Sequence, residues 1–370
     1  YMRIAISINR SWNIYNFRSG LVKALIADGH EVVAIAPKDE YSKLLMKMGC
    51  RFFPLEVQNT GSNPIKDISL YYEYLRIYRK IQPDIVLQYT IKPNIYGTLA
   101  AKKLSLPVIN NVSGLGTVFL NNGIVSFIAK LLYKVAFKRT DLVFFQNEDD
   151  RKEFLNNINI PNLNTDLLPG SGIDLKKFQP QPQLNGNKFT FLMISRIIKD
   201  KGIYEFVNAA KLAQKNNLEA KFQLLGEPDT NHRRGIQKEE INEWIDSGII
   251  EYLGVTDSVS DVIKEADCIV LPSYREGTPK TLLEGAAMGK PLIATNVAGC
   301  RQVVLEGENG FLCNVKDEES LFQAVNKMYN LDKIDLERMG RKGRQLMEEK
   351  YNETLVIEKY KYWIHKLSKK

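Results

Sequence analysis

The sequence predicts an α/β protein made of two doubly wound domains, each with a parallel sheet between helices. Three observations support this fold class. Residues 1–178 alternate short apolar strands with helical patterns at the spacing of right-handed β-α-β units. A polar, proline-containing stretch at 179–187 has the composition of an exposed linker. The same alternation then resumes and continues from 187 to 351, so a second domain of similar architecture is expected.

The first domain opens with an apolar strand at 3–8 and a loop at 9–18 that leads into a helix ending near Ala27. Gly29 and His30 then turn the chain into the next strand. Further strands are expected at 32–36, 52–55, 85–88, 107–112 and 142–145. The helices between them are expected near 41–48, 68–81, 95–104 and 124–138.

The second domain is expected to contain six strands, and a helix is expected after most of them. These strands are at 189–195, 222–225, 250–253, 268–271, 292–295 and 311–313. After the fourth strand, Thr278 is predicted to cap a helix that has Pro279 at its first position and stops at Gly289. The final segment, 352–370, has apolar residues at helical spacing and is expected to pack back on the first domain.

Composition narrows the class of protein. The chain has 370 residues, 44% of them hydrophobic, which is enough for two cores. No apolar run reaches the ~18 residues of a membrane span, and the N-terminal segment turns polar too soon for a signal peptide, so a cytoplasmic location is expected. The four cysteines form no CxxC pair and are expected to be reduced thiols. The net charge of +8 favours an anionic partner, but no repeat typical of nucleic-acid binding occurs.

Two cations are predicted at one edge of the second sheet. Arg196 follows the first strand of this domain, and Lys201 precedes the next helix, so both lie at the carboxyl edge that also receives Glu276. An arginine binds phosphate oxygens through two parallel hydrogen bonds and a lysine adds a point charge, so the pair suits a diphosphate. A solvated basic turn is the alternative reading.

Two carboxylates follow the strand at 268–271. Glu276 is predicted on the loop and Glu284 inside the next helix, an arrangement that does not favour a hydrolytic pair. A carboxylate accepts two hydrogen bonds side by side, so each glutamate suits the neighbouring hydroxyls of a sugar. A solvent-facing Glu284 is the alternative. No Asp-x-Asp occurs and the three histidines are scattered, so no metal site is expected.

A lysine-rich helix is predicted at 124–138. Lys130, Lys134 and Lys138 recur every four residues beside apolar side chains, a pattern that suits the surface of an anionic membrane. A core helix with a solvated lysine face explains the spacing equally well.

With these residues in place, the chain resembles the retaining glycosyltransferases of family 4, which have the GT-B fold of two facing Rossmann-like domains with a cleft between them. Glu276 and Glu284, with seven residues between them, match the paired glutamates of that family. Ser195-Arg196, Lys201-Gly202 and the segment 172–178 match further family motifs. Segments 14–18, 92–97, 114–116 and 299–300 are similar to bacterial enzymes that add an N-acetylhexosamine to an undecaprenyl-diphosphate-linked sugar in capsule, O-antigen or N-glycan assembly.

The resemblance implies hexosyl transfer from a UDP-sugar to a polyprenyl-diphosphate-linked acceptor, without a metal or cofactor. It implies that Arg196 and Lys201 hold the diphosphate, Glu284 the ribose and Glu276 the donor sugar. Backbone N–H groups near the start of the following helix would meet the sugar or phosphate, at Gly277, Thr278 and Pro279. The acceptor candidates belong to the first domain and are Tyr15, Phe17, Arg18 and Lys92.

The chain departs from many relatives in one respect. The segment 88–92 lacks the histidine that they place opposite the donor sugar, which leaves the roles of Lys92 and Ser113 open. Two other functions fit the same residues: a UDP-sugar epimerase of GT-B shape, and a non-catalytic module that binds sugar nucleotides or a membrane surface. Peripheral binding to the inner membrane face is compatible with the expected cytoplasmic location.

Overall fold

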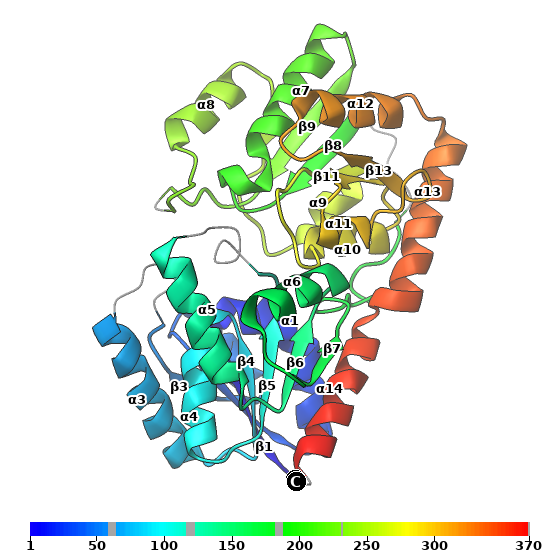
Figure 1. The fold of residues 1–370 in the computed structure, drawn as a ribbon. Coiled ribbons are helices and arrows are strands. Elements are labelled where there is room, and N and C mark those ends of the chain that lie inside the picture. The colour runs from blue at the N-terminus through cyan, green and yellow to red at the C-terminus, as the bar shows by residue number, and fades with distance from the viewer. Residues whose placement is uncertain (58–63, 116–122, 182–187, 231, 369–370) are drawn as a thin grey trace. The chain divides into compact units, whose positions relative to one another are not determined.

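The computed structural model describes the chain except for residues 58–63, 116–122, 182–187, 231 and 369–370. It divides the chain into two compact units, coloured along the sequence in Figure 1. Unit 1 comprises Tyr1–Ser171 and Thr354–Lys370, and unit 2 comprises Gly172–Glu353. Most of the stretch at 179–187 that was predicted as a linker, and Gly116 of the segment 114–116, lie outside the described residues.

Unit 1 contains a seven-stranded sheet in the order β3-β2-β1-β4-β5-β6-β7, with every pair parallel. Its strands are β1 (Arg3–Ser7), β2 (Glu31–Ala36), β3 (Arg51–Pro54), β4 (Ile85–Tyr89), β5 (Val108–Val112), β6 (Leu142–Phe145) and β7 (Thr165–Leu167). Its helices are α1 (Ser11–Ala27), α2 (Glu40–Lys47), α3 (Pro64–Ile81), α4 (Thr98–Lys103), α5 (Ile124–Phe137), α6 (Glu148–Ile158) and α14 (Glu353–Ser368), with a π-helical turn at Pro93–Gly97.

The two faces of this sheet have separate cores because successive strand residues point to opposite sides. Ile4 and Ile6 of β1 pack with α1 and α14, whereas Ala5 packs with α3 and α4. A third cluster joins the end of the sheet at β5 and β6 to α5 and α6. Strands that are buried on both faces read as continuous apolar runs, which is why their positions could be predicted.

Unit 2 contains a six-stranded parallel sheet in the order β10-β9-β8-β11-β12-β13. Its strands are β8 (Phe189–Ile194), β9 (Ala220–Leu225), β10 (Glu251–Tyr252), β11 (Cys268–Leu271), β12 (Leu292–Thr295) and β13 (Gly310–Cys313). Its helices are α7 (Ile203–Lys215), α8 (Lys238–Asp246), α9 (Val259–Glu265), α10 (Lys280–Ala287), α11 (Ala298–Arg301), α12 (Glu318–Tyr329) and α13 (Lys333–Leu346), with a 3₁₀ turn at Lys199–Lys201 and a π-helical turn at Met347–Tyr351. Strand order reverses direction between β8 and β11, the place where open α/β sheets bind ligands.

Two local expectations were wrong, and two elements of the structure were not predicted. Helix α1 begins at Ser11, so most of the predicted loop at 9–18 is helical, because Ile14, Arg18 and Leu21 form one buried helical stripe. The structure also contains α6 and β7, which were not predicted. Helix α10 begins at Lys280 and has Pro279 at its N-cap position without a side-chain cap, so Thr278 is not its cap.

The division between the units also differs in detail from the expected one. Residues 172–178 were assigned to the first domain, but Ile173 and Phe178 pack into the core of unit 2 around β11 and α10. The C-terminal residues 354–370 lie in unit 1, where Val356, Tyr360 and Ile364 of α14 belong to the same buried cluster as residues of β1 and α1.

Candidate functional site

The carboxyl edge of unit 2 brings Lys201 and Glu276 together. Lys201 ends the 3₁₀ turn after β8, and Glu276 lies on the loop after β11, the neighbouring strand. The Lys201 Nζ lies 2.5 Å from Glu276 Oε1, and both side chains are largely buried. An ion pair therefore stands at the point where the strand order reverses, where the sequence placed a cation and a carboxylate.

Backbone contacts hold the two loops of this pair in place. Gly202 has φ of +76°, and a β-carbon there would lie 2.1 Å from the carbonyl oxygen of Pro272, so only glycine fits. The backbone N–H of Tyr274 and the Ser273 hydroxyl both donate to the Asp200 carbonyl, at 2.9 and 3.2 Å. The close approach of the two loops therefore explains why a glycine follows Lys201.

Arg196 lies at the same edge but belongs to a different set of contacts. Its side chain is 56% exposed and its Nη1 lies 3.5 Å from Asp229 Oδ2. No described contact joins it to Lys201 or Glu276. An exposed arginine with one long ion pair can reorient to reach a ligand at little cost.

Sequence reasoning missed an ion pair beside these residues, between Arg234 and Asp200. Arg234 lies on the loop after β9, whose carboxyl end meets that of β8. In the sequence, the basic pair Arg233-Arg234 after an apolar strand could have indicated this ion pair, as Arg196 after the first strand indicated a cation.

Glu284 is a buried carboxylate inside α10, so it does not face solvent. Burial raises its pKa, and the positive charges of Lys280 and Lys177 oppose that rise. Lys280 Nζ lies 3.7 Å from Glu284 Oε1, one turn earlier in the helix. At the start of the same helix, the Thr281 hydroxyl is buried without a hydrogen-bond partner among the described residues. A polar ligand at this helix start would find a carboxylate, a hydroxyl and helix N–H groups.

Two glycines allow close packing of helices on strand β11 and on the loop that follows it. A β-carbon on Gly285 would lie 2.5 Å from the Ile269 side chain, so α10 packs directly on β11. A β-carbon on Gly299 would lie 2.1 Å from the carbonyl oxygen of Gly277. The short helix α11 therefore lies against the segment that contains Glu276, Gly277, Thr278 and Pro279.

The acceptor candidates of unit 1 are attached to different neighbours. Lys92 Nζ lies 2.7 Å from Asp67 Oδ1, so this lysine is tied to α3. The Tyr15 ring packs on Tyr41, with ring centres 5.6 Å apart. Phe17 likewise packs edge-to-face on Trp12, with ring centres 5.3 Å apart.

Arg18 differs from the other three candidates because it is buried. It lies beside the ring of Tyr89. The described contacts therefore do not bring the four acceptor candidates into one site.

No helix of the described residues is both long and apolar enough to cross a bilayer. Within the same residues, no cluster of three or more histidine, cysteine, aspartate or glutamate side chains has a metal-binding arrangement.

Two protein-family models match the chain. A model described as glycosyl transferases group 1 matches residues 174–346, and a model described as glycosyl transferase 4-like matches residues 3–147. One relative is the N,N'-diacetylbacillosaminyl-diphospho-undecaprenol alpha-1,3-N-acetylgalactosaminyltransferase of Campylobacter jejuni, 27% identical over 97% of each chain. Another is the UDP-Gal:alpha-D-GlcNAc-diphosphoundecaprenol alpha-1,3-galactosyltransferase of Escherichia coli, 26% identical over 80% of this chain and 79% of that protein.

Solved structures share the fold at lower identity. A sucrose-phosphate synthase from Thermosynechococcus elongatus has a TM-score of 0.83 at 20% identity, covering 99% of each chain. HepE from Anabaena, solved with UDP-glucose, has a TM-score of 0.82 at 16% identity, covering 99% of this chain and all of that one. The prediction of two Rossmann-like domains in a GT-B fold is confirmed.

Proposed function

Because the chain belongs to the group 1 glycosyl transferases, we propose that it moves a hexose from a UDP-sugar to a polyprenyl-diphosphate-linked saccharide, with retention of anomeric configuration. The hexose is an N-acetylhexosamine in this proposal, and the product is a precursor of a bacterial capsule, O-antigen or glycan. The supporting observation is the similarity over 97% of its length to an enzyme whose name includes a diphospho-undecaprenol acceptor. The Escherichia coli relative is likewise named for a UDP-sugar and a diphosphoundecaprenol.

In this proposal, the carboxyl edge of unit 2 binds the donor. Arg196 and Lys201 hold the diphosphate, on which negative charge grows as the bond to the sugar breaks, so cations placed there favour the transition state. Glu276 uses Oε1 to position Lys201 and presents Oε2 to hydroxyls of the donor sugar. Glu284 accepts hydrogen bonds from the ribose. Backbone N–H groups near Gly277, Thr278 and Pro279 lie at the start of α10, which favours the phosphates.

We place the acceptor on unit 1 and its lipid in a membrane that α5 contacts. Five apolar side chains of this helix share one exposed face at spacings of three, four and seven residues. They are Ile124, Phe127, Ile128, Leu131 and Val135, of which the first two are 80% and 70% exposed. Lys130 and Lys134 are half-buried on the same helix, and Lys138 is its exposed C-cap residue, so apolar contact would combine with attraction to anionic lipids. Peripheral binding to the cytoplasmic face of the membrane would bring the enzyme to its lipid-linked acceptor.

The proposed function is tested with a panel of UDP-sugars and a short-chain polyprenyl-diphosphate sugar, with product mass and anomeric configuration read by mass spectrometry and NMR. We expect a product one N-acetylhexosamine heavier, with the α configuration of the donor. A β-linked product would contradict retention. An isomerised sugar nucleotide formed without acceptor would indicate an epimerase, and UDP binding without turnover a binding module.

The same assay tests the role of Lys201. Lys201→Ala should lower turnover by about a hundredfold or more, the loss expected when one group that stabilises transition-state charge is removed. The matched control is Lys199→Ala, which removes an exposed positive charge from the same 3₁₀ turn. Wild-type turnover in Lys201→Ala would exclude this lysine from the site.

A further inference from the structure

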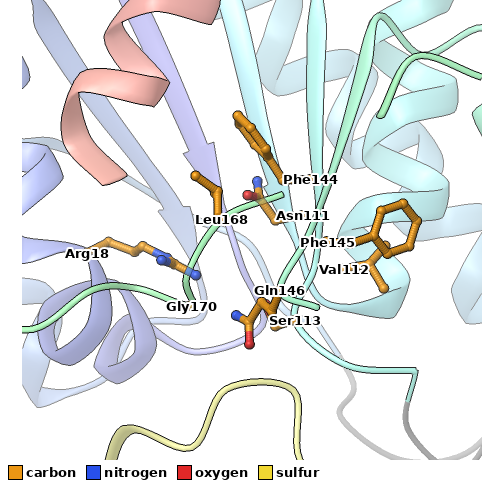
Figure 2. Close-up of a pocket in the computed structure, with 9 residues that line it drawn as sticks. All are labelled: Arg18, Asn111, Val112, Ser113, Phe144, Phe145, Gln146, Leu168 and Gly170. Atoms are coloured by element: carbon orange, nitrogen blue, oxygen red, sulfur yellow. The ribbon is translucent and has the colours of Figure 1, made fainter. Parts of the chain in front are cut away.

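Arg18 lines a small hollow at the carboxyl end of the sheet of unit 1 (Figure 2). The hollow has a volume of about 10 Å³ and is bordered by residues that follow or end β5, β6 and β7. Its polar side chains come from Arg18, Asn111, Ser113 and Gln146. Space for one water-sized group means that one oxygen of a larger ligand can enter while the rest lies outside.

The charge of Arg18 has no counterpart among the described residues. Only 7% of the residue is exposed, and no hydrogen bond or ion pair joins its side chain to another described group. Its Nε is buried and unpaired. None of the residues that border the hollow carries a carboxylate. A buried charge without a partner is unfavourable, and arginine keeps its proton in proteins, so the cost remains until an anion binds.

The neighbouring phenols do not compensate this charge. The guanidinium lies over the ring of Tyr89, 4.5 Å from its centre. Burial raises the pKa of Tyr89 and of Tyr360, so both hydroxyls are neutral at physiological pH. A cation above a neutral ring gains a modest attraction, less than the cost of leaving the charge unpaired.

The same phenols hold the guanidinium in a fixed place. The Tyr89 hydroxyl donates to the Tyr360 hydroxyl at 2.9 Å, and Tyr360 donates in turn to Asn111 Oδ1. The Asn111 Nδ2 donates to the carbonyl oxygen of Gln88 at 3.1 Å, which anchors the chain of hydrogen bonds to β4. Arg18 is therefore a positioned cation at a ligand-binding edge of a parallel sheet.

We propose that Arg18 binds a phosphate oxygen of a substrate at this hollow. A guanidinium matches phosphate geometry through parallel N–H groups, and a phosphate supplies the missing negative charge. The neighbouring Ser113 hydroxyl, at the exposed end of β5, is suited to donate to the same group. That the phosphate belongs to a substrate rests on the proposed function, in which donor and acceptor both carry a diphosphate.

Calorimetric titration of the full chain tests this proposal without relying on activity. The probes are farnesyl diphosphate, inorganic pyrophosphate and UDP, with farnesol as the uncharged counterpart of the first. The variants are Arg18→Gln, which removes the charge, and Arg18→Lys, which keeps the charge but loses the planar fork. Arg79→Gln, an exposed arginine on α3, is the control for the same loss of charge in unit 1. Thermal unfolding of each variant checks that it is folded.

Arg18→Gln should weaken binding of a diphosphate probe by about 10- to 100-fold, with an intermediate loss in Arg18→Lys and none in Arg79→Gln. A loss confined to farnesyl diphosphate and pyrophosphate would assign the phosphate to the acceptor, and a loss for UDP would assign it to the donor. Equal affinity of wild type and Arg18→Gln for all three probes would overturn the proposal, as would wild-type binding of none of them. If the protein still transfers sugar while either of these binding results is found, the proposed function stands and only the proposed Arg18 site is rejected.

Discussion

At Glu284, two physical demands oppose each other. A carboxyl group accepts hydrogen bonds from a ribose most strongly when it is ionised, yet burial in α10 raises the pKa of this group and penalises the ionised form. Lys280, 3.7 Å away, only partly offsets that penalty. The side chain is therefore costly for folding and useful for binding, as ligand-binding groups often are.

Glu284→Gln should separate these two effects. Because the pKa of the folded state is raised, the wild type loses stability relative to the variant as pH rises through that pKa. The variant should therefore be more stable at neutral pH and equal at pH values below the ordinary pKa of a glutamate. UDP affinity should fall by about 10- to 100-fold, because hydrogen bonds to a charged group are lost. In the wild type, UDP affinity should decrease as the pH falls through the raised pKa of Glu284, because the carboxylate becomes protonated.

Thermal unfolding and UDP titration from pH 4 to 8 measure both effects. Glu239→Gln, an exposed substitution of the same kind on α8, is the control and should change neither. A variant that is less stable than the wild type at neutral pH would show that the Lys280 contact, not burial, dominates at Glu284.

At the scale of the element, helix α5 has two apolar faces that serve different purposes. Tyr133 and Phe137 pack against Phe154 of α6 in the core of unit 1. Phe127 and Leu131 remain exposed on the other side, where the fold gives them nothing to pack against among the described residues. Spacing alone could not distinguish the face that packs inward from the face that a membrane would cover, because both recur at helical intervals.

If α5 binds a membrane, substitutions of its lysines and of its exposed apolar residues should affect liposome binding in different ways. The triple variant Lys130→Ala, Lys134→Ala, Lys138→Ala should weaken binding to anionic liposomes by about 100-fold at low salt, at ~1 kcal/mol per lysine, and less at high salt. The double variant Phe127→Ser, Leu131→Ser should weaken binding at every salt concentration, with little change in stability because both side chains are exposed. Sedimentation with liposomes measures this, and Ile334→Ser, an exposed apolar residue of α13, is the control. Unchanged binding in both variants would leave α5 as an ordinary surface helix.

For the whole molecule, the sequence predicted what depends on continuous apolar runs. Both sheets and the edge that holds Lys201 and Glu276 follow from strands buried on two faces, whose carboxyl ends meet. The helical position and the burial of Arg18 were not predicted. Arg18 interrupts the apolar stripe of α1, and the start of that helix was therefore read as a loop. The boundary at Gly172 was also missed. Ile173 packs into unit 2 through contacts with residues far along the chain, and such contacts cannot be read from the local sequence.

Because each unit has its own buried clusters, damage to one core should remain within it. Ile364 of α14 is buried against the cluster that contains Ile4 and Leu25, so Ile364→Ala should cost about 2–5 kcal/mol. Hydrogen exchange followed by mass spectrometry should show faster amide exchange in the strands and helices of unit 1, including β1 and α1, with the sheet of unit 2 unchanged. Leu321→Ala on α12, equally buried in unit 2, should give the reverse pattern. Faster exchange in both units from either substitution would mean that they unfold as one cooperative body, and that α14 couples the whole chain rather than completing the first unit alone.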